Sequence, residues 1–326
     1  MTGWRLRYAG RRLAQVVPVV LAMVVFNFAL LHLAPGDAAD VLAGESGSAT
    51  PEFMAQLRAE FGLDRPLLVQ LGYYLRQVLS LDLGFSFRHK LPVLDLILTR
   101  LPATLVLMGT AITLAVTLGC LLGVLAARYV NTWVDGVVSV FALLSYATPI
   151  FWIGLMLIVL FGIHLGWLPT HGMALAGTGV AGLGYALDVG RHLILPAATL
   201  ALFYVALYTR LMRAAMLEVY ALDYVQSARA KGVPDRLVRR RHVVPNAFLP
   251  TFTLIFLSFG FVLGGAVVIE TVFSWPGLGL LTYDAIKSLD YPVIQGVFLI
   301  ASAAVIVANL IADITYGYLD PRIKQA

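Results

Sequence analysis

Long apolar stretches separated by polar segments are the dominant pattern along this chain. Each stretch is about as long as the ~20 residues with which a helix crosses the hydrocarbon core of a bilayer. Backbone groups in lipid must pair within their own segment, so runs this uniform predict helices, and the alternating pattern of a membrane barrel is absent. We predict an all-α membrane protein with six transmembrane helices. They cover Leu13–Leu33, Ala103–Ala127, Val134–Ile163, Leu193–Leu217, Phe248–Ile269 and Val293–Tyr316.

Basic residues favour one side of the membrane. If the N-terminus is cytoplasmic, the short outer loops hold only Arg191 and Lys287, whereas fifteen basic residues lie inside. Residues 34–100 are left out of this comparison, because loops beyond ~60 residues cross largely regardless of charge. The bias therefore predicts that both termini are cytoplasmic. The inner residues are Arg5, Arg7, Arg11, Arg12, Arg128, Arg210, Arg213, Arg229, Lys231, Arg236, Arg239, Arg240, Arg241, Arg322 and Lys324.

The pattern divides the chain into two regions. Residues 1–100 hold the first helix and a long extracytoplasmic loop, which we expect to be folded because two amphipathic patterns flank a turn at 62–66. The arginines before Leu13–Leu33 resemble a secretory signal, but this stretch is longer than a signal core and predicts a retained helix. Residues 101–326 form a core of five transmembrane helices, with a cytoplasmic loop at 218–250.

Composition narrows the class of protein. The chain is 60% hydrophobic and 13% charged, whereas soluble domains carry about 25% charged residues. The net charge of +5 fits cytoplasmic loops beside anionic membrane lipid, and we expect no nucleic-acid partner. Cys120 is the single cysteine, which excludes an internal disulfide and a cysteine metal cluster.

Catalytic signatures are missing. No lysine follows a glycine, so the chain lacks a standard phosphate-binding loop, and the metalloprotease and nucleophile-elbow patterns are also absent. We expect a chain that is not an enzyme and holds no cofactor, so that any ATP and Mg would be bound by partner subunits. His164, His171 and His192 share the glycine-rich outer loop at 162–192, where solvated histidines are favoured over a metal site.

The loop at 218–250 is the most informative segment. Leu217, Ala221, Tyr224 and Ala228 recur at helical spacing and predict one apolar stripe. Lys231-Gly232 predicts a helix stop, Pro234 suits the start of a second helix, and Pro245 is expected to end that helix. A rigid helix-break-helix fits a groove in a partner, but the residues alone favour a basic segment that lies on anionic lipid, because polybasic loops commonly have that role.

The same loop resembles the docking loop of permeases of ATP-binding-cassette (ABC) importers. That family has Glu-Ala-Ala, three residues, Gly, nine residues and Ile-x-Leu-Pro, and this chain has Gln226-Ser227-Ala228, Gly232 and His242-Val243-Val244-Pro245 at the same spacing. The resemblance implies a coupling helix that inserts into the ATPase subunit. The implied docking residues are Tyr224, Gln226, Ser227, Ala228, Lys231, Gly232 and Pro245.

Further stretches are similar to the first permease of dipeptide, oligopeptide and nickel importers. This resemblance implies the type I importer permease fold, in which the chain forms half of the pore beside a second permease, two ATP-binding subunits and an extracytoplasmic substrate-binding protein. The stretches are Leu33-Ala34-Pro35-Gly36-Asp37, Gly62-Leu63-Asp64-Arg65-Pro66, Arg100-Leu101-Pro102-Ala103-Thr104, Glu270 to Gly279, Asp290-Tyr291-Pro292-Val293 and Tyr318-Leu319-Asp320-Pro321-Arg322.

The outer segment from Glu270 to Gly279 is a candidate gate. Trp275-Pro276-Gly277 is a turn beside an aromatic, which also suits simple anchoring at the membrane interface. The resemblance favours an outer gate that involves Glu270, Trp275, Pro276 and Gly277.

Two alternative functions stay open. One is a permease for another solute, such as a sugar or an amino acid, in the same class of importer. The other is a membrane-embedded enzyme or a self-powered carrier whose basic loop binds lipid, and this alternative predicts function without an ATPase partner.

Overall fold

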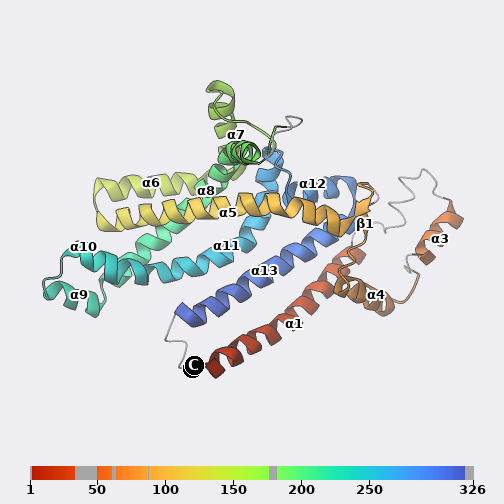
Figure 1. Cartoon of the computed structure of the whole chain (residues 1–326), viewed down its shortest axis with the longest axis horizontal. Helices are drawn as coiled ribbons and strands as arrows, with labels where there is room; N and C mark the ends of the chain where they lie inside the picture. The colour runs from red at the N-terminus through yellow and green to blue at the C-terminus, as the bar shows by residue number, and fades with distance from the viewer. Residues whose placement is uncertain (1, 34–49, 61–63, 87, 176–181, 320–326) are drawn as a thin grey trace. The chain divides into compact units, whose positions relative to one another are not determined.

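The computed structural model describes residues 2–33, 50–60, 64–86, 88–175 and 182–319, and almost all of its regular structure is helical (Figure 1). The chain forms two compact units. One unit comprises Met1–Pro102 with Leu281–Ala326, and the other comprises Ala103–Leu280, so that the boundaries fall inside two helices, α5 (Val93–Arg128) and α12 (Leu278–Ser288). This division by packing differs from the two regions predicted from the sequence, because the last helix groups with the first.

The unit that contains both ends of the chain is organised around α1 (Thr2–Leu33) and α13 (Tyr291–Leu319), which pack side by side (Figure 1). The predicted folded loop supplies α3 (Pro51–Glu60), α4 (Leu67–Leu79) and an unpredicted hairpin of β1 (Phe85–Ser86) and β2 (Leu91–Pro92).

Asp290 joins this hairpin to α13. Its carboxylate accepts a hydrogen bond from the Ser86 hydroxyl at 2.5 Å, and both residues are buried. The Asp290-Tyr291-Pro292-Val293 stretch therefore begins α13 and ties it to the folded loop that follows α1.

The other unit is built on α8 (Leu183–Tyr220), which packs against α6 (Trp133–Ala147), α7 (Ile150–Leu157) and α11 (Val244–Val272). Close approach of α5 to α8 needs glycine, since a Cβ on Gly119 would lie 2.6 Å from the Cβ of Tyr208 and one on Gly123 would lie 2.7 Å from that of Met212. Small residues four apart are a common helix contact in membranes. The remaining elements are η1 (Ile158–His164), α9 (Asp223–Ala230), α10 (Asp235–Val238) and η2 (Arg239–Val243).

Fewer of the described helices than the predicted six meet the length and composition of a membrane span. Among the described residues, three helices are long and apolar enough to cross a bilayer, or up to four if a bent pair counts as one. The prediction of one continuous helix at Val134–Ile163 is wrong, because this segment forms α6 and the α7–η1 helix, which meet at 102°. Pro149 has no N–H and disfavours helical geometry at Thr148, which is extended with ψ 131°.

Two further predictions need correction. The irregular outer loop is shorter than 162–192, because η1 continues to His164 and α8 begins at Leu183, so His192 lies inside a helix. The Glu270 to Gly279 segment leads into α12, which was not predicted. The Leu33-Ala34-Pro35-Gly36-Asp37, Gly62-Leu63 and Asp320-Pro321-Arg322 stretches lie wholly or mostly outside the described residues.

Candidate functional site: a docking loop and a buried outer segment

The loop between α8 and α11 has a helix-break-helix form (Figure 1). Helix α9 ends at Ala230, and Gly232 follows with φ +81°, a left-handed backbone conformation that glycine adopts without steric cost. Pro234 occupies the N-cap position of α10, which fits its fixed φ. The predicted break at Lys231-Gly232 is therefore present.

Two details of the predicted loop are wrong. The apolar stripe does not lie on one helix, because α8 ends at Tyr220 and Leu222 is extended with ψ 144° before α9 begins. Pro245 does not end a helix either. It lies in the first turn of α11, where its missing N–H costs no helical hydrogen bond.

Apolar packing fixes the loop to the rest of its unit. Val225 of α9, Val238 of α10 and Val243 of η2 are all fully buried in one cluster with Met216 of α8. Ala228 packs against the same cluster. Burial of three valines from three short elements makes the loop a rigid extension of α8 and α11, so displacement of the loop would move both helices.

A basic-acidic network braces the break. The Arg229 guanidinium donates to the Asp235 carboxylate at 2.8 Å across the turn, and it lies 4.9 Å from the centre of the Tyr220 ring. Arg239 approaches the same carboxylate at 3.7 Å. Because the pair is partly exposed, its main effect is on the geometry of the turn rather than on overall stability.

The outward face of the loop carries most of the predicted docking residues. Tyr224, Gln226, Ser227, Lys231 and Gly232 are exposed, whereas Ala228 is half-buried. Pro245 is exposed at the start of α11. The loop thus exposes backbone, hydroxyl, amide and ammonium groups above its buried valines.

The outer segment, Glu270 to Gly279, takes part in a buried hydrogen-bond network centred on Glu270, here called the Glu270 network. The Glu270 carboxylate, fully buried, accepts from the Thr104 hydroxyl at 2.7 Å and from the Leu280 backbone N–H at 3.0 Å. The Thr104 hydroxyl oxygen in turn accepts from the Leu278 N–H at 2.7 Å. One acidic side chain at the end of α11 therefore connects α5 with the start of α12.

Trp275 lies next to the Glu270 network. It is fully buried, and its indole N–H donates to the Ala103 carbonyl at 2.9 Å. A tryptophan that anchors a helix at the interface exposes its ring to lipid, so simple anchoring does not describe this side chain. Gly277 packs directly on the Glu270 carboxylate, leaving no room for a Cβ. Pro276 completes the turn before α12.

Comparisons with known proteins show the family to which the chain belongs. The family described as "Binding-protein-dependent transport system inner membrane component" matches residues 119–325, and its N-terminal companion family matches residues 5–108. The chain belongs to this family. The permease is therefore a membrane subunit of an ABC importer, and its family is one of transport subunits rather than of enzymes.

Named relatives match the permease over nearly its whole length. The dipeptide transport system permease protein DppB of Escherichia coli K12 is 39% identical and that of Alkalihalophilus pseudofirmus 37%, each match covering 98% of this chain and 99% of the relative. A probable peptide ABC transporter permease protein of Sinorhizobium fredii is 40% identical over 97% of this chain and 99% of its own. A solved amino acid ABC transporter chain aligns at TM-score 0.49 with 18% identity, over 70% of this chain and 94% of its own.

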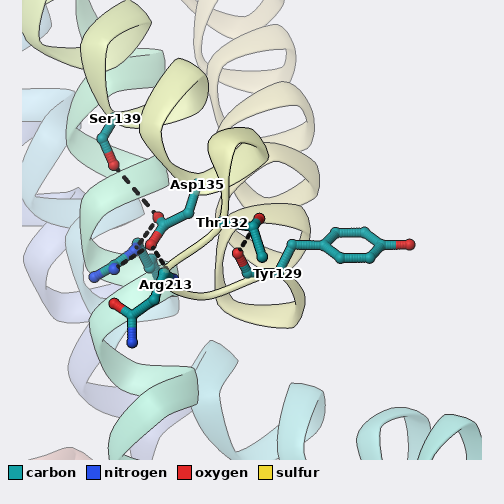
Figure 2. Close-up of polar contacts among 6 residues, drawn as sticks. Tyr129, Thr132, Asp135, Ser139 and Arg213 are labelled. Atoms are coloured by element: carbon teal, nitrogen blue, oxygen red, sulfur yellow. Dashed lines mark hydrogen bonds and ion pairs between the residues drawn. The ribbon is translucent and has the colours of Figure 1, made fainter.

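The permease contains an ion pair that its sequence pattern alone did not indicate. Asp135, at the start of α6, accepts two hydrogen bonds from Arg213 of α8, both at 2.7 Å (Figure 2). The Asn131 N–H and the Ser139 hydroxyl also donate to Asp135, at 3.1 and 3.4 Å. The available signal was an acidic residue at the edge of an apolar stretch, which requires a partner.

We expect Arg213→Met to destabilise the permease, because it leaves the largely buried Asp135 carboxylate without its main partner. The free energy of unfolding should fall by about 2–3 kcal/mol. Thermal denaturation in detergent measures this change. Ser139→Ala is the matched control, because it removes only the weakest contact of the same carboxylate; equal melting temperatures for both variants would contradict the assignment.

Gln226 explains a departure from the family pattern. Its side-chain amide donates to the Tyr220 carbonyl at 2.8 Å and so satisfies an acceptor at the end of α8. A carboxylate has no such donor. We expect Gln226→Glu to loosen the α8–α9 turn and raise its rate of amide hydrogen exchange several-fold, with Ser227→Ala as the control; unchanged exchange in Gln226→Glu would contradict this role.

The three outer histidines do not lie together in one loop of the permease. His192 is buried in α8, where it bonds to the Asp188 carbonyl at 2.9 Å, while His164 ends η1 and bonds to the Val159 carbonyl at 3.1 Å. His171 contacts the Thr170 hydroxyl at 3.0 Å. Within the described part of the chain, no three His, Cys, Asp or Glu side chains converge as a metal site requires.

Proposed function

We propose that this permease forms half of the translocation pathway of an importer for dipeptides or oligopeptides. The other half would be a second homologous permease. Two separate subunits would bind ATP and Mg, and an extracytoplasmic binding protein would deliver the cargo. Six transmembrane helices with both termini in the cytoplasm complete the proposal, placing the chain in the bacterial inner membrane.

The cargo class is supported by the relatives. Proteins named for dipeptide or peptide transport match 97–98% of this chain at 37–40% identity. Each match therefore extends over nearly the whole length of both chains. Nickel chelates are an alternative cargo, because the sequence also resembles nickel importers. None of the three relatives named above is named for nickel transport.

The rigid docking loop is the observation that supports ATP coupling. Valines buried in α9, α10 and η2 join the loop to α8 and α11. An ATPase that grips the exposed face of α9 would therefore displace two spanning helices as one body. ATP can drive this change only by binding more tightly to one conformation of the assembly than to the other.

The Glu270 network supports the proposal that the outer segment acts as a gate. It connects α11 with α5 and α12 through hydrogen bonds that the fully buried Glu270 side chain accepts from Thr104 and Leu280. Because α11 begins at the docking loop and contains Glu270 in its last turn, it is the element through which a displacement at the cytoplasmic side would reach the outer segment.

Transport by the reconstituted assembly tests the proposal. The permease and its co-purified subunits would be placed in proteoliposomes, with ATP on the side of the ATP-binding subunits and the binding protein on the other. We expect ATP-dependent accumulation of a labelled dipeptide or short peptide, with no accumulation of a free amino acid or a sugar. Uptake of only the sugar or the amino acid, or peptide uptake without ATP, would contradict the proposal.

A further inference from the structure

Helix α4 lies beside the end of α1 in the unit that contains both chain ends (Figure 1). Asn27 of α1 donates to the Tyr74 hydroxyl at 2.9 Å, and the rings of Phe28 and Tyr74 lie 5.8 Å apart. One turn further along, the His32 ring bonds to the Gln70 side chain at 3.0 Å. These contacts fix the helix by its Gln70–Tyr74 side.

The contacts also fix the depth of α4. Leu33 ends the first apolar stretch, and Asn27 precedes it by six residues, or about 9 Å along a helix. Tyr74 therefore sits below the point where α1 leaves the hydrocarbon. Helices that lie in the membrane interface are buried to a depth of about 5–10 Å, which is the depth that these contacts give α4.

The side of α4 away from these contacts is apolar and open. Leu68 and Leu79 are 83% and 84% exposed. They are eleven residues apart, which places them within about 20° of each other around a helix, whereas Gln77 lies about half a turn away. Leu71 and Leu75 fall on the same face between them and are half-buried.

The end of α1, against which α4 packs, also carries exposed apolar side chains. Phe26 and Leu33 of α1 are 64% and 80% exposed, and in the proposed six-helix topology α1 crosses the bilayer, so that these side chains would face acyl chains. The face of α4 carries no charge between Leu68 and Leu75, and Arg76 is long enough to extend its guanidinium to the headgroups. Arg65 lies just before the helix and donates to the Tyr73 hydroxyl at 2.7 Å, on the polar side.

We propose that α4 is an interfacial helix whose Leu68–Leu79 face is inserted among the acyl chains of the leaflet where α1 ends. The helix anchors the extracytoplasmic loop to the membrane surface. That this leaflet is the outer one rests on the proposed orientation of the chain, but insertion itself does not. The partner is therefore lipid, and neither the binding protein nor a second permease covers this face.

Depth measurements on the intact assembly test the proposal. In a Cys120→Ser background, single variants Leu68→Cys, Leu79→Cys and Gln77→Cys would carry an environment-sensitive fluorophore, in nanodiscs with and without lipids brominated on their acyl chains. We expect severalfold stronger quenching by brominated lipid at positions 68 and 79 than at position 77, and the reverse order for quenching by aqueous iodide.

Each alternative result overturns the proposal. Iodide quenching at positions 68 and 79 equal to that at 77 would mean that the face is in water. Protection from both quenchers would mean that another protein covers it. Because these readouts do not depend on transport, they remain valid if the proposed peptide cargo or the proposed orientation proves wrong.

Discussion

Replacement of Gly277 by alanine should strongly destabilise the permease, although it adds only one methyl group. A Cβ at this position would collide with the carboxylate of Glu270, which cannot move freely because the Thr104 hydroxyl and the Leu280 N–H hold it. Overpacking typically costs about 1–3 kcal/mol, and leaving a buried hydrogen-bonding group without its partner costs about 1–3 kcal/mol. We expect a loss of about 3 kcal/mol in the free energy of unfolding.

Thermal denaturation of the detergent-solubilised permease would measure this loss. Gly109→Ala is the matched control, since it also adds one methyl group in the same unit but meets nothing within 4 Å. The control should melt like the parent protein, whereas Gly277→Ala should melt several degrees lower. Equal stability of the two variants would contradict the close packing of Gly277 on the Glu270 side chain.

Gly232→Asp should abolish ATP-coupled uptake while the protein still reaches the membrane. Gly232 is exposed and has open space around it, so the new side chain need not disrupt folding. Its φ of +81° strains a residue with a side chain, and the carboxylate adds a charge that must be desolvated when a partner covers the loop. We expect uptake to fall at least about tenfold, equivalent to 1.4 kcal/mol.

Gly232→Asn separates the two causes. Asparagine has nearly the same size and tolerates the left-handed conformation better than most residues, but it carries no charge. This variant should retain more uptake than Gly232→Asp. Membrane content measured by immunoblotting must be equal for both variants, and normal uptake by Gly232→Asp at equal content would remove the docking role from this loop.

The long apolar helices and the break in the loop between α8 and α11 could be predicted because their causes are local. Apolar length predicts a helix in lipid, and a glycine followed by Pro234 predicts an interruption. The interruption at Leu222 has no comparable signal, since Ala221 and Leu222 are both compatible with a helix and the end of α8 is set by its packing. The bend at Thr148–Pro149 did have a local signal, but the length of the apolar run outweighed it in the prediction.

The chemistry of the outer segment could not be predicted from its own residues. Glu270 reads as a polar residue at the end of a span until Thr104, 166 positions away, is brought against it. The same holds for Asp135 and Arg213, which are 78 positions apart. Such pairs are created by helix packing, and a single sequence contains no measure of which helices are neighbours.

Site-specific cross-linking tests most directly whether the loop couples the permease to an ATPase. A photoreactive amino acid at Ser227, on the exposed face of α9, would be irradiated in native membranes, with the same group at exposed Trp133 as a control for chance contacts. We predict that Ser227 captures a protein with a phosphate-binding loop, that Trp133 does not, and that a second permease co-purifies. Cross-links from Ser227 to lipid alone, in a permease that purifies without any ATP-binding subunit, would contradict the account.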